Sequence, residues 1–245
     1  PHLDRLAAES ADFTQAISGH PVCAPFRASL FTGKYSSSTG MAINELRLDC
    51  RHHCFAHVLR ENGYAADYIG KWHLWANQLG HRDDSANSFI PPGPYRLGFD
   101  DFWAAYNFHH NYSRAYYHGD TPERIMLPGY EPDAQTDLAI SRLAARAASG
   151  RPFALFLSSG TPHAPWDAAN VPAEWLARLA ETYFGRPDNY RPDDDPQADA
   201  WARLKPEERR ALPEWMRVYY AMTANLNANL GRLRAALERL KLAEN

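Results

Sequence analysis

Two short apolar runs constrain the fold of this chain most strongly. Residues 64–69 (YAADYI) and 153–157 (FALFL) are rich in aromatic and branched side chains and have the length of buried strands. We expect the second run to be the most buried strand. Asp133 begins a predicted helix that ends near Ala148, and Pro213 begins a long helix near the end of the chain. This alternation of strands and helices indicates an α/β architecture.

Each apolar run leads directly into a loop that carries basic side chains. Lys71 and His73 follow the first run, within GKWHL, and His163 follows the second run, within TPHAP. Side chains just after a strand lie at its carboxyl end, where open α/β sheets bind ligands. Lysine neutralises an anion, and histidine donates a hydrogen bond or transfers a proton. The same residue types are also common on solvated loops, so these two loops alone leave the function open.

A cysteine near a predicted helix start supplies a candidate reactive group. Pro25 suits the first turn of that helix and Gly33 suits its end. Cys23 therefore lies just ahead of a helix N-terminus, where unpaired N–H groups and the helix dipole favour negative charge. Arg27 lies one turn further along and can fold back to the same point. An anionic substrate beside a reactive side chain fits this arrangement; the alternative is a buried helix whose cysteine is merely a small apolar residue.

Spacing and composition exclude several classes of protein. Phosphatases that use a cysteine thiolate need a longer loop between Cys and Arg, and Ser29 stands where their Arg would be. The net charge of −3 provides no basic field for nucleic acid. Three cysteines do not make a disulfide framework. No apolar run approaches the ~20 residues that cross a membrane.

The segment CAPFR, with its LFTG ending, resembles the signature of the type I, formylglycine-dependent sulfatases. GKWHL resembles the second motif of that family and PHAP the third, in the same order and across nearly the whole chain. Phe26 departs from the pattern, because the family usually has Ser or Ala there. The resemblance implies an alkaline-phosphatase-like α/β/α sandwich with a mainly parallel central sheet, incomplete at both ends. Residues 1–245 would then form part of a single catalytic domain.

The resemblance implies hydrolysis of a sulfate ester. Cys23 would be oxidised to formylglycine by a separate formylglycine-generating enzyme, and one hydroxyl of the hydrated aldehyde would attack sulfur. The other hydroxyl would then expel sulfate and restore the aldehyde. Arg27 and His73 would hold and tune this diol. Lys71 and His163 would bind sulfate oxygens and stabilise the growing charge.

The resemblance also implies a divalent metal, calcium in this family, which would bind residue 23 as formylglycine and polarise the sulfate group. The family draws its carboxylate ligands from segments before Pro1 and after Asn245, so we expect them to be absent from this chain. The clustered acids at 83–84, 100–101 and 193–195 do not directly follow a predicted strand. We therefore expect these 245 residues alone to lack turnover.

Residues 75–131 are expected to form an aromatic-rich insertion that makes a wall of the site. A long irregular segment in a compact domain is usually functional or disordered, and aromatic content argues against disorder. His109 is a candidate substrate contact within this insertion, as are Asn107 and His110. A structural role fits these three residues equally well.

Four potential metal ligands recur at helical spacing, namely Cys50, His53, Cys54 and His57. A zinc site is disfavoured, because four ligands along one helix cannot surround an ion tetrahedrally. The simpler prediction is an ordinary helix that stops at Gly63. We also predict a short amphipathic helix over residues 1–12 and a short strand at 13–17.

Two other functions stay open. A phosphonate monoester or phosphodiester hydrolase of the same superfamily can use the same signature, and a catalytically inert fragment would only bind a sulfated ligand. The expected partners are a small-molecule or sugar sulfate ester and the formylglycine-generating enzyme, with neither nucleic acid nor membrane. No signal peptide is visible, and the compartment, bacterial periplasm or cytoplasm, stays open.

Overall fold

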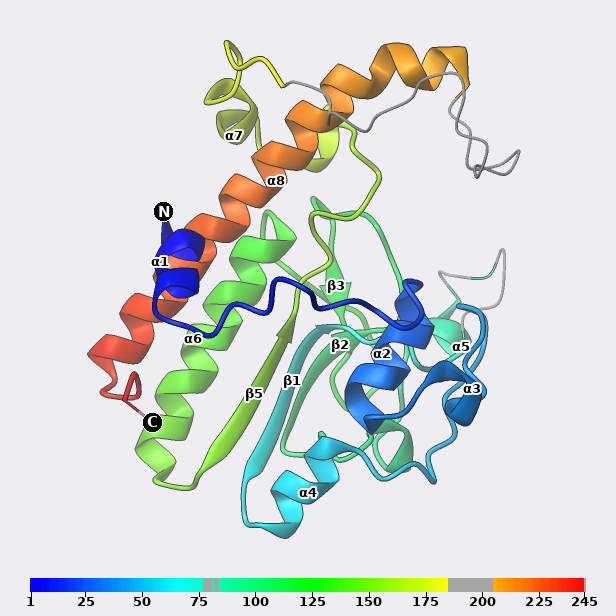
Figure 1. The fold of residues 1–245 in the computed structure, drawn as a ribbon. Helices are drawn as coiled ribbons and strands as arrows, with labels where there is room; N and C mark the ends of the chain where they lie inside the picture. The colour runs from blue at the N-terminus through cyan, green and yellow to red at the C-terminus, as the bar shows by residue number, and fades with distance from the viewer. Residues whose placement is uncertain (77–80, 82–83, 185–204, 245) are drawn as a thin grey trace.

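A three-stranded parallel sheet lies at the centre of the computed structural model, which describes residues 1–245 except 77–80, 82–83, 185–204 and 245. The strand order is β2-β1-β5, with bounds Phe102–Tyr106, Ala65–Lys71 and Phe153–Ser158. Helices cover both faces of this sheet (Figure 1). The observed arrangement is therefore an α/β/α sandwich with a parallel central sheet.

Side chains alternate between the two faces of β1, as the pleat of a strand requires. Ala66 and Tyr68 pack with α2 (Cys23–Thr32) and α4 (Phe55–Glu61). Ile69 packs with α6 (Glu131–Ser149) and α8 (Pro206–Arg239) on the other face. Every residue of β1 is buried, because β2 and β5 flank it and helices cover both faces.

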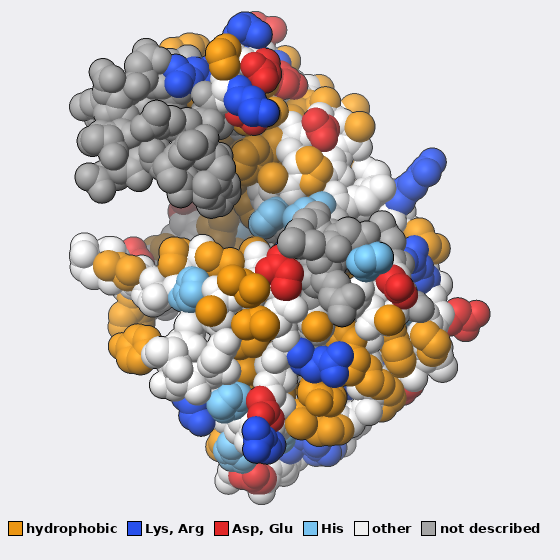
Figure 2. All heavy atoms as spheres, turned by 90° about the vertical axis from the view of Figure 1, so that its right-hand side faces the viewer, with side chains coloured by type: hydrophobic (Ala, Val, Ile, Leu, Met, Phe, Trp, Pro, Cys, Tyr) orange, Lys and Arg blue, Asp and Glu red, His pale blue; other side chains and the backbone are white. Residues whose placement is uncertain are grey.

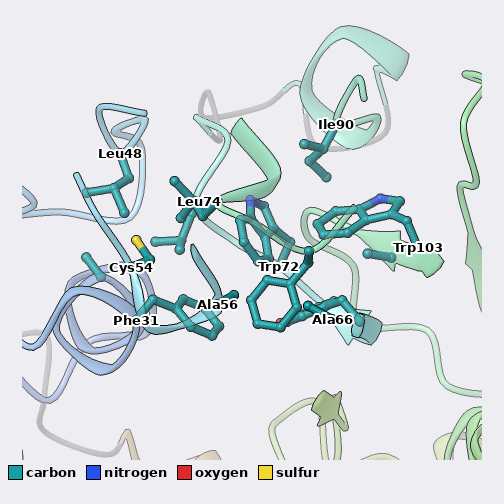
Figure 3. Close-up of a cluster of buried hydrophobic side chains, with 14 of the residues drawn as sticks. Phe31, Leu48, Cys54, Ala56, Ala66, Trp72, Leu74, Ile90 and Trp103 are labelled. Carbon is teal, nitrogen blue, oxygen red and sulfur yellow. The ribbon is translucent and has the colours of Figure 1, made fainter. Parts of the chain in front are cut away.

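Aromatic side chains form the core on the α2 face of the sheet. Figure 3 shows Trp72 at the centre of this cluster with Phe31 and Trp103 beside it. The Phe31 ring centroid lies 5.3 Å from that of Trp72 and 5.3 Å from that of Phe156 in β5. Large rings in such contact bury much apolar area and add favourable ring–ring interactions. The core therefore holds α2, and with it Cys23, against the sheet.

Polar contacts hold the helices on the opposite face. Arg146 of α6 donates a hydrogen bond from Nε to the fully buried carboxylate of Asp67 in β1, at 2.8 Å. Asp133 of α6 accepts hydrogen bonds from Asn225 and Asn229 of α8, at 2.8 and 2.7 Å. Buried charged and polar groups of this kind are tolerated because each has a partner. These bonds fix α6 against β1 and α8 against α6.

The remaining elements are short. They are α1 (His2–Ala8), α3 (Ser36–Thr39), α5 (Ser85–Ser88), η1 (Pro94–Arg96), β3 (Tyr116–Tyr117), β4 (Ile125–Met126), η2 (Ala168–Asn170) and α7 (Ala173–Ala177). Strands β3 and β4 pair antiparallel as a separate hairpin. No helix in the described ranges has the length and apolar character to span a bilayer. Figure 2 shows acidic, basic and hydrophobic side chains interspersed over one face of the molecule, outside the grey atoms.

Several predicted boundaries were wrong at the ends of helices and strands. Residues 13–17 form no strand, and Phe13 and Ile17 are 78% and 87% exposed. Helix α8 begins at Pro206, so Pro213 lies inside it. The Glu208 carboxylate accepts a hydrogen bond from the Lys205 N–H and caps the helix at this earlier start. Tyr130, not Asp133, precedes the first turn of α6.

Two predictions about the sheet also need correction. Strand β5 is only half-buried for most of its length, because it is an edge strand of the sheet, and β1 is the fully buried one. Segment 75–131 contains β2, which pairs in parallel with β1. Part of the segment therefore belongs to the central sheet, and only the rest lies outside the sheet.

Helix α4 covers only Phe55–Glu61, so Cys50 and His53 precede it and cannot share a helical face with His57.

Replacing Phe31 by Ala should lower the free energy of unfolding by about 3–5 kcal/mol, because it removes a ring from the middle of the core. Phe31 is 1% exposed. The matched control is Phe13→Ala, whose ring is 78% exposed and which should change that free energy by less than about 0.5 kcal/mol. Urea unfolding measures both, and equal losses from the two variants would contradict this description of the core.

Candidate active site

The parallel register brings three strand ends to one edge of the sheet. Lys71, the last residue of β1, pairs with Tyr106, the last residue of β2. Gly70 of β1 pairs with Ser158, the last residue of β5. The loops after these strands therefore leave the sheet side by side, as the sequence predicts, although Lys71 itself ends β1 and does not lie in the loop.

Helix α2 presents Cys23 at the same edge. The helix begins at Cys23 itself, whereas the sequence placed Cys23 just ahead of the helix. The helix ends at Thr32 and is capped by Gly33, whose φ of 67° is the left-handed conformation that glycine favours. The Asn44 side chain accepts a hydrogen bond from the Ala24 N–H at 2.9 Å, which satisfies one unpaired donor of the first turn. Cys23 thus occupies the first turn of a helix whose N-terminus is stabilised by Asn44, a residue 20 positions further along the chain.

Arg27 connects this helix to the sheet. Its Nη1 donates to the backbone oxygen of Lys71 at 2.7 Å and to Oγ of Ser158 at 2.9 Å. The same nitrogen lies 3.4 Å from the Tyr68 hydroxyl. One guanidinium therefore fixes the start of α2 against the carboxyl ends of β1 and β5.

Cys23 lies in a small pocket of about 250 Å³. The lining residues are Cys23, Phe26, Arg27, Lys71, Ser159, Gly160, Thr161, Pro162 and His163. All the charged or titratable side chains in this lining, apart from the thiol, are basic. The pocket is therefore suited to a small anion.

The His163 imidazole lines the same pocket as the Cys23 thiol. Its hydrogen-bonding interaction with the thiol, followed by the charges of Lys71 and Arg27, lowers the pKa of Cys23 to about 7 against the opposing effect of burial. The same interaction raises the pKa of His163. An unmodified Cys23 therefore carries substantial thiolate at neutral pH.

Lys71 and His73 are both buried but differ in contact with the pocket. Burial lowers the pKa of Lys71 to about 8, and its Nζ lies 4.8 Å from the Phe108 ring centroid. Burial, followed by the charges of Lys71 and Arg27, lowers the pKa of His73 to about 2, so its imidazole is neutral. His73 has a φ of 61°, both ring nitrogens lack a hydrogen bond, and it does not line the pocket.

The three candidate contacts from segment 75–131 behave differently from one another. His109 is buried beneath Tyr106, with ring centroids 3.7 Å apart, and does not line the pocket, so the structure does not support the predicted substrate contact. The Asn107 amide is fully buried and bonds the backbone of Trp75, Ala76 and Asn87. The His110 ring lies 4.4 Å from that of His163.

Sequence reasoning missed two residues behind the pocket. Glu131, the first residue of α6, is fully buried, and burial raises its pKa to about 7. An acid in the first turn of a helix is common, so nothing local marks Glu131 as unusual. The Tyr112 hydroxyl lies 3.1 Å from the backbone oxygens of both Gly160 and His163. Aromatic content was the only signal that could have drawn attention to Tyr112.

The described residues do not fit a calcium site at Cys23. Within the described ranges, no group of three or more His, Cys, Asp or Glu side chains comes together that could hold a metal ion. Asp100 and Asp101 pair with Arg60 and Arg151. The acids at 193–195, and Asp83, lie outside the described residues.

Comparison with known proteins decides the family. The profile of the family described as Sulfatase matches residues 1–245. The chain belongs to the sulfatase family. An Ulvan-active sulfatase of Formosa agariphila is 35% identical over 246 residues, covering 100% of this chain and 43% of the relative. An N-acetylglucosamine-6-O-sulfatase of Bacteroides thetaiotaomicron is 29% identical over 193 residues, covering 77% of this chain and 30% of the relative.

A solved sulfatase structure has the same fold. The putative sulfatase yidJ from Bacteroides fragilis matches with a TM-score of 0.81 at 28% identity, over 100% of this chain and 54% of its own. The alkaline-phosphatase-like fold expected from the three sulfatase motifs is thereby confirmed. The chain spans about half the length of the sulfatases that it matches.

Unmodified Cys23 should react with iodoacetamide at a rate whose pH midpoint lies near 7, the value to which its pKa is lowered. Removing the imidazole with His163→Ala should move that midpoint upward, toward the ordinary value of about 8.5 for a free thiol. Peptide mass spectrometry over a pH series measures the rate.

Cys54 serves as the internal control for this measurement. Burial raises its pKa to about 11, so it should stay unreactive where Cys23 alkylates. An unchanged midpoint in His163→Ala would show that the imidazole does not activate the thiol.

Proposed function

We propose that this sulfatase-family protein hydrolyses a sulfate ester through a formylglycine formed at Cys23. The observation that carries the proposal is the pocket in which Cys23 lies together with Arg27, Lys71 and His163. A sulfate monoester carries a single negative charge on a small group, which matches a small cavity whose charged side chains are basic. The formylglycine-generating enzyme would be the partner that converts the thiol to the aldehyde.

The proposed reaction has two steps at residue 23. One hydroxyl of the hydrated aldehyde attacks sulfur, the ester S–O bond breaks, and the alcohol leaves with a proton. The second hydroxyl then loses its proton, the bond between the formylglycine carbon and the sulfate oxygen breaks, and the aldehyde returns. Water restores the diol. Covalent catalysis of this kind replaces one difficult displacement with two easier ones.

The side chains around residue 23 have separate parts in this proposal. Lys71 and His163 donate to the sulfate oxygens and stabilise the charge that grows in the transition state. Arg27 is already bonded to Lys71 and Ser158, so its rigid guanidinium orients the diol. His73 is neutral and buried, so it tunes the site from behind the pocket.

A sugar sulfate is the substrate class that we propose. Two relatives are named for the carbohydrates on which they act, ulvan and N-acetylglucosamine-6-O-sulfate. Phe26 and Pro162 provide apolar surface in the pocket lining beside the charged groups. Sites that combine apolar walls with a few placed polar groups bind small organic ligands.

Coexpression with a formylglycine-generating enzyme should lower the mass of the Cys23 peptide by about 18 Da, because an aldehyde replaces the thiol as the nucleophile precursor. Mass spectrometry of tryptic peptides measures the change. A known sulfatase expressed in the same cells is the control. Conversion of that control without conversion of Cys23 would exclude the formylglycine proposal.

Lys71→Ala and His163→Ala should each lower kcat/KM for a sugar sulfate ester by about 10²–10³, because each removes a donor to the developing charge. The assay uses the intact modified protein and measures released sulfate. Lys34→Ala, an exposed change outside the pocket, is the control and should be unaffected. Faster turnover of an aryl phosphonate than of any sulfate ester would instead identify a phosphonate hydrolase.

A further inference from the structure

Glu131 places a carboxylate where no solvent reaches it. Its side chain has no exposed surface, and it lies directly behind the loop that lines the Cys23 pocket. An ionised group at such depth is costly unless several donors satisfy it. The proposed reaction does not use this residue, so its contacts require another explanation.

Three donors converge on the Glu131 carboxylate from three segments. The Tyr106 hydroxyl, at the end of β2, donates to Oε1 at 2.8 Å. Nε2 of Gln135, one turn along α6, donates to the same oxygen at 3.1 Å. The Gly160 backbone, in the loop after β5, packs against Oε1 as well, and its N–H favours the charged form of Glu131 and so lowers its pKa. Glu131 therefore joins α6, β2 and this loop at one point.

Tyr112 holds the same loop from its carbonyl side. Its hydroxyl lies 3.1 Å from the Gly160 oxygen and 3.1 Å from the His163 oxygen. The backbone carbonyl oxygen of Tyr112 accepts a hydrogen bond from the Glu131 N–H at 2.8 Å. Glu131 and Tyr112 are thus linked to each other, and together they contact the N–H and the carbonyl oxygen of Gly160.

Gly160 lies too close to these two residues to carry a side chain. A Cβ atom there would lie 2.7 Å from Cε1 of Tyr112, 2.8 Å from Oε1 of Glu131 and 2.8 Å from the Tyr106 hydroxyl. Contacts that short do not occur for real Cβ atoms, so the loop backbone rests directly on the Glu131 network.

The exposed position of His163 makes its support important. The imidazole is exposed to solvent, and beyond its Cys23 bond its Nδ1 contacts only the backbone oxygen of the next residue, at 2.8 Å, among the hydrogen bonds described. The His110 ring packs 4.4 Å from it, so the location of the His163 ring depends on that contact and on the backbone that Glu131 and Tyr112 fix.

We propose that Glu131 and Tyr112 are positioning residues, which hold the Gly160–His163 backbone so that the His163 imidazole meets residue 23. Neither side chain lines the pocket, so both act through the loop and not on the substrate. The consequence for catalysis rests on the proposed function, whereas the contact between His163 and Cys23 can be tested without turnover.

The test compares Cys23 alkylation by iodoacetamide at pH 7 in the full-length protein, expressed without a formylglycine-generating enzyme. Glu131→Met removes the acceptor and should slow alkylation about five- to tenfold, because the thiol loses its imidazole partner. Glu131→Gln keeps an acceptor oxygen and should restore most of the rate. Tyr112→Phe, which removes only the hydroxyl, should slow the reaction in the same direction.

Gln135→Met is the matched control. It makes the same replacement at a buried residue that bonds the same carboxylate but has no hydrogen bond to the Gly160–His163 backbone among those described. Its rate should stay within about twofold of the parent, since no hydrogen bond to that backbone is lost. Thermal unfolding of every variant separates loss of fold from loss of positioning.

A double-mutant cycle provides the decisive comparison. In a His163→Ala background, Glu131→Met and Tyr112→Phe should have no further effect on the alkylation rate. Substitutions that act through the same imidazole have effects that do not add once that imidazole is removed. Unchanged alkylation in folded Glu131→Met, or an equal loss in the His163→Ala background, would overturn the proposal. If Glu131→Met does not fold, parent-like alkylation in Tyr112→Phe would overturn it. Absence of sulfate ester hydrolysis would refute only the proposed function.

Discussion

The contact on which the site depends is the hydrogen bonding of Arg27 to the ends of two strands. Its guanidinium reaches the backbone oxygen of Lys71 and the hydroxyl of Ser158 from the second turn of α2. Because Lys71 and Ser158 end adjacent parallel strands, one side chain sets the position of Cys23 relative to both loops. The aromatic core beneath, with Phe31 stacked on Trp72, keeps the helix from tilting away.

The electrostatics of the pocket follow from this geometry. Arg27, Lys71 and His163 surround a thiol, and burial penalises the charge of Lys71 strongly enough to lower its pKa. Like charges held together in a poorly solvated site raise the free energy of the empty pocket. An anion relieves that repulsion, so the same arrangement favours a small bound anion over water.

The sequence predicted the parts of this protein whose signals are local. The helix before Gly33 and the loops after β1 and β5 were evident from proline, glycine and strand patterns, whereas the resemblance to the sulfatase motifs assigned Cys23, Lys71 and His163 to one site. Asn44, Tyr112 and Glu131 were not evident, because each acts on a partner many residues away and has no local signature. The start of α8 was misplaced for a different reason, since an internal proline resembled a beginning.

His73 illustrates how stability and chemistry oppose each other at one position. Its backbone adopts a left-handed conformation that costs a non-glycine residue about 1–3 kcal/mol, and its ring nitrogens are buried without partners. A glycine would relax the backbone and remove the unsatisfied ring nitrogens, but it would also remove the packing of the buried ring against Phe108, whose centroid lies 4.7 Å away. Position 73 therefore combines backbone strain and unsatisfied polar atoms with a side chain that fills the space behind the pocket.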